Sequence, residues 1–99
     1  MLIKLVYLTI AAQKSNLEMA VLQRFEIVYR DMTADVVEHR LKNGRVFYIA
    51  FKQQIPKPLV ITVAEDSNGK KFWTSLPEGR QMEAEDVGRL VASYIRSHR

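Results

Sequence analysis

The sequence predicts a small α+β domain: an antiparallel meander of four strands, or five if the N-terminal part adds one, with a C-terminal amphipathic helix packed on one face. Two Asn-Gly pairs, Asn43-Gly44 and Asn68-Gly69, lie between runs rich in β-branched and aromatic residues. Asn-Gly is the strongest short-range hairpin signal, because both residues tolerate the positive φ angles of a type I′ turn. An apolar stripe at helical spacing follows near the C-terminus. With 99 residues, the chain has room for a single domain.

The first 20 residues do not specify one secondary structure, and we expect them to be peripheral to the domain or to cover part of its sheet. Residues 2–10 are mostly apolar and fit a buried strand or a short helix equally well. Ser15 with Glu18 matches a capping box, which predicts a short helix. The apolar face of that helix would consist of Leu17, Val21, Leu22 and Phe25. The alternative is a turn near Ser15 followed by a strand, since residues 25–29 are strand formers.

The first Asn-Gly pair predicts a hairpin with arms at residues 36–42 and 45–51. A competing interpretation makes residues 33–42 a helix that is capped by Thr33 and terminated by Gly44 in the left-handed conformation. We prefer the hairpin and keep the helix as the alternative.

The second pair predicts a hairpin with arms at residues 59–65 and 70–76, after a connection that contains Pro56 and Pro58. A two-residue turn would place Asp66 opposite Lys71. It would also divide the side chains between two faces. One face would carry Ile61, Val63, Phe72 and Leu76, and the other Val60, Thr62, Ala64, Trp73 and Ser75.

The final helix is predicted over residues 82–97. Its apolar stripe consists of Val87, Leu90, Val91, Tyr94 and Ile95. Acidic residues lie near its start and basic residues near its end, as the helix dipole favours. Gly88 costs a helix about 1 kcal/mol relative to alanine, so we interpret it as a point of close approach to the sheet.

Charge and composition bound the function only broadly. The net charge is +4 and the pI about 9.6, which favours anionic partners such as nucleic acid but is equally typical of small proteins that are charged for solubility. The absence of cysteine excludes disulfides and thiolate chemistry. The apolar run at residues 5–12 is shorter than the ~20 residues of a membrane span and lacks a signal-peptide cleavage pattern. We therefore expect a cytoplasmic protein without membrane contact.

No residue pattern indicates an enzyme, a cofactor site or a metal site. No phosphate-binding loop, dinucleotide fingerprint, nucleophile elbow or zinc-protease helix occurs. His98 is penultimate, and His39 is predicted to be a surface residue of a strand. An acidic group with a histidine, Asp31, Asp35, Glu38 and His39, has a spacing that matches no ligand pattern.

A short internal repeat supplies the candidate interaction residues. Both Asn-Gly pairs continue as basic-x-Phe-aromatic, which ends at Tyr48 and at Trp73. On the predicted register both rings lie on the sheet face away from the helix, about 10 Å apart. Basic residues would cluster at the shared turn end of the sheet: Lys42, Arg45, Lys70 and Lys71.

Two functions fit this surface. The first is self-association or binding of a protein partner through an open sheet face that is too apolar to remain exposed. Its residues would be Val46, Tyr48, Ala50, Val60, Thr62, Ala64 and Trp73. The second is weak binding of single-stranded nucleic acid, with bases on the aromatics and phosphates on the basic turn ends. We prefer the first and expect Trp73→Ala to disrupt association more than folding.

The predicted order of sheet and helix resembles, in topology alone, double-stranded-RNA-binding domains and the small DNA-binding domains of some integrases. The former begin their last helix with a basic segment, whereas residues 80–86 here are mainly acidic. The resemblance therefore implies no RNA docking through this helix and transfers no site residues.

Overall fold

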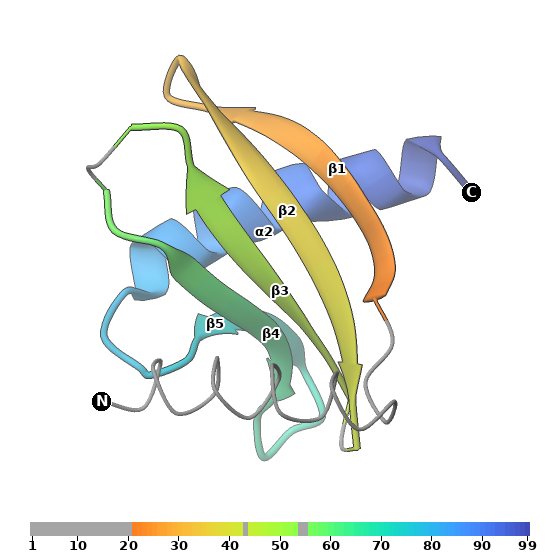
Figure 1. Cartoon of the computed structure of the whole chain (residues 1–99). Coiled ribbons are helices and arrows are strands. Elements are labelled where there is room, and N and C mark those ends of the chain that lie inside the picture. Colours follow the sequence, from red (N-terminus) through yellow and green to blue (C-terminus); the bar gives the residue numbers. More distant parts are fainter. Residues whose placement is uncertain (1–20, 43, 54–55) are drawn as a thin grey trace.

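A computed structural model describes residues 21–42, 44–53 and 56–99 of the chain. In this part, five antiparallel strands form one sheet whose spatial order follows the chain, and a single helix lies across one face (Figure 1). The elements are β1 (Val21–Tyr29), β2 (Met32–Leu41), β3 (Gly44–Phe51), β4 (Leu59–Glu65), β5 (Lys71–Ser75) and α2 (Gln81–Ser97). The predicted α+β meander is confirmed, with five strands.

The structure decides between two alternatives that the sequence left open. Residues 33–42 belong to strand β2 and not to a helix, so the hairpin interpretation is correct. Residues 21–29 form strand β1, which contradicts a helix that extends as far as Phe25. The expectations for residues 1–20 lie outside the described residues.

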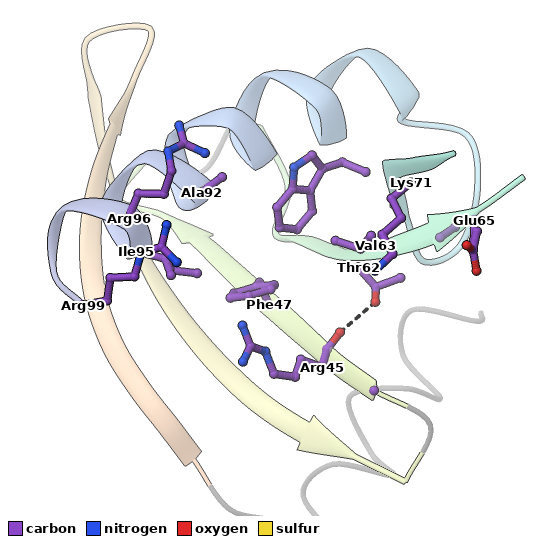
Figure 2. Close-up of a pocket in the computed structure, with 13 residues that line it drawn as sticks. Arg45, Phe47, Thr62, Val63, Glu65, Lys71, Ala92, Ile95, Arg96 and Arg99 are labelled. Atoms are coloured by element: carbon purple, nitrogen blue, oxygen red, sulfur yellow. Dashed lines mark hydrogen bonds between the residues drawn. The ribbon is translucent and has the colours of Figure 1, made fainter. Parts of the chain in front are cut away.

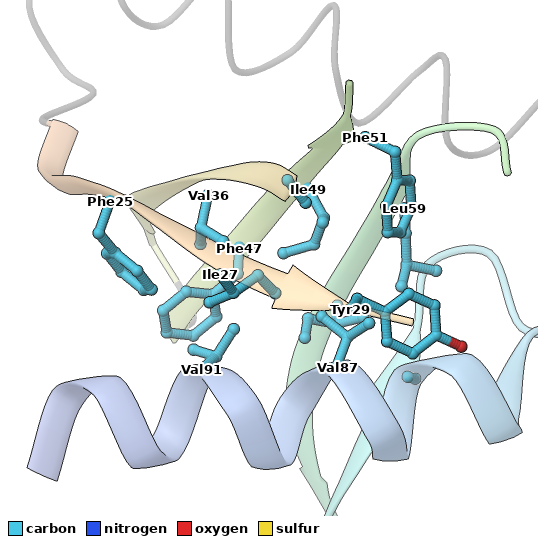
Figure 3. Packing of buried hydrophobic residues seen from close by; sticks show 13 residues of the cluster. Phe25, Ile27, Tyr29, Val36, Phe47, Ile49, Phe51, Leu59, Val87 and Val91 are labelled. Carbon is cyan, nitrogen blue, oxygen red and sulfur yellow. The ribbon is translucent and has the colours of Figure 1, made fainter. Parts of the chain in front are cut away.

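The main core lies between the sheet and α2 (Figure 3). Strands alternate their side chains between two faces, and on β1 to β4 the buried apolar residues facing the helix follow this alternation. The helix contributes Ala84, Val87 and Val91, which belong to the predicted apolar stripe or adjoin it. The sheet contributes Phe25, Ile27, Tyr29, Ala34, Val36, Phe47, Ile49, Phe51, Leu59 and Ile61.

A second, smaller cluster lies on the sheet face opposite α2, which we call the open face. Val46 and Val60 are buried there. Leu41, Tyr48 and Leu76 pack against them and are partly buried. The sheet therefore has apolar side chains on both faces, as the sequence analysis expected for Val46, Tyr48 and Val60.

The register of the β2–β3 hairpin preserves the predicted faces. Leu41 pairs with Gly44, and Val37 pairs with Tyr48. The sequence predicts this turn one residue later on each arm. In the observed register, the partner of each β2 residue therefore lies two positions earlier in β3 than predicted. Because side chains alternate with a period of two, Phe47 still faces the helix and Tyr48 the open face.

The register of the β4–β5 hairpin differs by one residue, and the predicted faces of β5 are therefore wrong. Glu65, not Asp66, pairs with Lys71. Asp66 lies in the connection, where its Oδ1 accepts hydrogen bonds from the backbone N–H of Asn68 at 2.8 Å and of Lys70 at 2.9 Å. This turn lengthens the loop, and a shift of one residue exchanges the two faces of a strand. Trp73 and Ser75 thus face α2, and Phe72 faces the open side.

The start of α2 is fixed by hydrogen bonds of Ser75 and Arg80. The buried Ser75 hydroxyl donates to Pro77 O at 2.8 Å and accepts from the Arg80 N–H at 3.1 Å. The Arg80 guanidinium pairs with Glu83 and donates to the carbonyl oxygens of Lys57 and Pro58. These contacts join the loop before β4 to the first turn of the helix. Within the described residues, no helix has the length and apolar character needed to cross a membrane.

Candidate interaction surfaces

The open face exposes large apolar side chains at both edges of the sheet. Val28 of β1 is 63% exposed, Phe72 of β5 37% and Leu22 of β1 36%. Val28 and Phe72 belong to the open face by strand alternation, and Leu22 lies beside it at a β-bulge. Between these edges lies the second cluster of Val46 and Val60. The apolar centre of this face is therefore buried, and its large exposed apolar side chains lie at its ends.

The open face continues into a pocket of about 530 Å³ at the end of the sheet where α2 begins. Tyr48 and Leu76 line it from the sheet, and Pro58 and Pro77 line it from the loops. Arg80, which also lines this pocket, holds the loop before β4 against the start of the helix. The apolar surface is therefore partly concave.

A different pocket, of about 490 Å³, lies on the helix side between the C-terminal half of α2 and strands β3 to β5 (Figure 2). Phe47 and Trp73 line it and meet edge to face, with ring centroids 5.6 Å apart. Ala92 and Ile95 line it from the helix. Four cationic side chains and one acidic one, Glu65, surround these apolar walls. The cations are Arg45, Lys71, Arg96 and Arg99.

The guanidinium of Arg45 is held by a buried carboxylate. Glu38 of β2 is only 1% exposed, and its Oε2 lies 2.6 Å from Arg45 Nε. Gln23 of β1 donates a hydrogen bond of 2.7 Å to Glu38 Oε1. Both oxygens of the carboxylate therefore have a polar contact, which a buried charge requires. Half of the Arg45 side chain remains exposed.

The sequence does not predict the burial of Glu38 and places His39 on the surface, whereas the structure buries both residues. The signal for Glu38 was present in the alternation of β2, since Ala34, Val36 and Glu38 share the helix-facing side. His39 lies on the open side of the same strand, beside Val46 of β3. Adjacent residues of a strand point to opposite faces, so Glu38 and His39 do not form one site.

The six predicted interaction residues separate into three groups. Trp73, Arg45 and Lys71 line the helix-side pocket. Tyr48 lies on the open face, so the predicted platform of Tyr48 with Trp73 does not exist. Lys42 and Lys70 are exposed at the ends of the two hairpins and do not line the helix-side pocket.

Among the described residues, no group of three or more histidine, cysteine, aspartate or glutamate side chains is arranged to hold a metal ion. This includes Asp31, Asp35, Glu38 and His39, the group considered from the sequence. Comparisons with protein families, with curated proteins and with solved structures found no match to this chain.

Proposed function

We propose that this chain is a non-enzymatic interaction module that associates with a protein partner, or with a second copy of itself, through its open sheet face. The observation that supports this proposal is the exposure of Leu22, Val28 and Phe72 on the side of the sheet that α2 does not cover. Large apolar side chains that are exposed cost free energy in water, and such residues are typical of protein interfaces.

The distribution of charge on the open face also suits a protein interface. Polar residues of β1 and β2 lie between the apolar side chains, and two of them, Glu26 and Asp35, contact Lys52 at 3.8 Å and 3.0 Å. Interfaces that are not permanent combine an apolar centre with a polar rim. The partly concave pocket at Tyr48 and Leu76 would receive a protruding apolar side chain of the partner.

The experiment compares two sets of variants of nearly equal chemistry. Val28→Thr with Phe72→Thr reduces the apolar area of the open face. Val63→Thr changes an apolar side chain of β4 that is 46% exposed but faces the helix side. Sedimentation velocity over a range of concentrations, together with affinity capture from extract, should show association that is lost in the first variant and kept in the second. Equal behaviour of both variants would contradict the proposal.

A second candidate function is weak binding of single-stranded nucleic acid, and the helix-side pocket is the specific observation that favours it. The pocket combines two aromatic rings with Arg45, Lys71, Arg96 and Arg99. Bases stack on aromatic side chains while basic side chains contact phosphates. This arrangement replaces the Tyr48 platform with the partly buried Trp73, which rests on the buried Phe47.

Fluorescence anisotropy with a labelled mixed-sequence oligonucleotide tests this candidate. Arg96→Gln with Arg99→Gln should weaken binding and reduce its dependence on salt, because fewer phosphate contacts release fewer counterions. Lys57→Gln is the matched control, since Lys57 is exposed at the opposite pocket. If all three proteins bind equally, the helix-side pocket is not the site.

A further inference from the structure

Strand β1 is one edge of the sheet, and no strand of the described chain pairs with its outer side. It is nine residues long and contains no proline. Exposed edge strands of this length offer unpaired backbone N–H and C=O groups to another strand. On the open side, β1 carries four exposed residues in order: Leu22, Arg24, Glu26 and Val28.

This order is complementary to its own reverse. Read forward it is apolar, basic, acidic, apolar, and read backward it is apolar, acidic, basic, apolar. An antiparallel strand with the same sequence therefore presents an acid opposite each base and an apolar side chain opposite each apolar one. Cross-strand pairs of this kind are the unit by which sheets are stabilised.

We propose that two copies of the chain pair edge to edge along β1, antiparallel, with the two-fold axis at Phe25. Arg24 of each copy then lies opposite Glu26 of the other, and Val28 approaches the β-bulge at Leu22. The two five-stranded sheets become one continuous sheet with both helices on the same side. This inference goes beyond the proposed function, because it names a second copy as the partner and the β1 edge, rather than the open face, as the surface that binds it.

The two-fold axis is determined by charge. Side chains on one side of a sheet pair only with side chains on that side, so the axis must pass through a residue of β1. An axis at residue 24 brings two Arg24 side chains together, and an axis at residue 26 brings two Glu26 side chains together. Like charges that face one another across a sheet are unfavourable. Among these central positions, residue 25 alone pairs opposite charges.

The local structure of β1 agrees with this axis. From Gln23 to Tyr29 the strand pairs regularly with β2, and the only irregularity lies between Val21 and Gln23. The residues nearest the axis are therefore in regular extended geometry. On the helix side, Phe25 is stacked on Tyr94 with ring centroids 3.8 Å apart, which holds the residue at the axis in place.

The last turn of α2 supplies further contact area. Figure 1 shows that the C-terminal end of the helix extends past β1. In this turn Tyr94 also stacks on His98, again with a centroid distance of 3.8 Å. The helix end therefore lies beside the edge that the two copies would share.

Charge reversal tests the pairing. Sedimentation equilibrium of the full chain should show a dimer. R24E puts acidic side chains opposite one another at both central pairs, and E26R puts basic side chains there. The dissociation constant of the dimer should therefore rise at least about tenfold for each variant alone. The double variant R24E/E26R restores opposite charges and should dimerise again. Lys70→Glu, exposed at the β4–β5 hairpin and outside β1 and both pockets, is the control and should behave as the wild type.

A mixture of the two single variants is the sharpest measurement. When the R24E chain meets the E26R chain, all four central charges are complementary, so the mixture should form a mixed dimer although each variant alone is a monomer. Thermal unfolding by circular dichroism checks that each variant is folded. A monomeric wild type, or a dimer that ignores R24E, would overturn the inference. If association were instead lost in the Val28→Thr and Phe72→Thr protein but unchanged in R24E, the open face would be supported and the β1 edge rejected.

Discussion

Gly88 of α2 and Trp73 of β5 lie in direct contact where the middle of the helix packs against this edge strand of the sheet. A Cβ atom on residue 88 would lie 2.2 Å from Trp73 Cγ, far inside any real carbon–carbon contact. The indole also meets Phe47 edge to face, so it has little room to retreat. The glycine that weakens the helix in isolation is therefore the residue that allows the helix to approach the sheet.

Gly88→Ala should destabilise the protein by up to about 2 kcal/mol, because the helix-propensity gain of ~1 kcal/mol offsets only part of an overpacking cost of ~1–3 kcal/mol. Thermal and denaturant unfolding measure the change. Ser93→Ala, at an exposed position of the same helix, is the propensity control and should not destabilise. In a Trp73→Leu background the smaller side chain leaves space, so Gly88→Ala should there be neutral or stabilising. A stabilising effect in the wild type would contradict the contact.

Trp73 and its neighbour Phe72 should respond oppositely to truncation. Trp73→Ala removes a partly buried ring from the helix side and should cost about 2–4 kcal/mol of stability without changing association. Phe72→Ala removes a ring that is 37% exposed on the open face and should reduce association with a smaller loss of stability. Chemical unfolding and sedimentation velocity separate the two effects. The reverse pattern would support the original expectation that Trp73 belongs to the interaction surface.

The difference between these two residues shows what sequence patterns determine and what they do not. Alternation and Asn-Gly pairs predicted the meander, and Gly88 predicted the close approach of the helix. The predicted faces of β5 are wrong because the prediction assumes that Asn68-Gly69 forms the whole turn. Asp66 accepts two backbone hydrogen bonds and draws one more residue into the loop on one side. An aspartate shortly before Asn-Gly signals such a turn, but it does not fix the register by itself.

The buried Glu38 illustrates a second limit. A single glutamate in a strand of charged and apolar residues is normally exposed, and its burial depends on Gln23 and Arg45, which come from two other strands. These partners meet only after the sheet has formed. The helix-side pocket shows the same limit. The sequence predicts Arg45 and Lys71 as candidate interaction residues, but Arg96 and Arg99 lie beside them only because α2 packs against the sheet.

Arg45→Met should destabilise the protein more than the double substitution that also removes the charge of Glu38. Arg45→Met leaves the Glu38 carboxylate buried with only Gln23 as a partner, and we expect a loss of about 1–3 kcal/mol, reduced from fully buried pairs because half of Arg45 is exposed. Glu38→Gln in the Arg45→Met background removes the unpaired charge and should recover part of the loss. A double-mutant cycle from urea unfolding gives the coupling. Additive effects would show that the pair contributes little.

The Arg80–Glu83 pair should make stability depend on pH in the acidic range. The hydrogen bond from Arg80 lowers the pKa of Glu83 below its ordinary value, and the positive charge of Arg80 acts in the same direction. A carboxylate with a lowered pKa in the folded state adds stability that is fully present above the unfolded pKa and is lost as pH falls through the folded pKa. Stability should therefore decline below about pH 4.5.

The contribution of this pair should be about 1 kcal/mol or less, because both side chains are partly exposed and solvent screens them. Urea unfolding of the wild type and of Glu83→Gln between neutral and acidic pH measures it, and the variant should lose less stability on acidification. Glu78→Gln, at an exposed loop position, is the matched control and should follow the wild type. If Glu83→Gln also follows the wild type, Arg80 acts at the start of α2 through the carbonyl oxygens of Lys57 and Pro58 rather than through its charge pair.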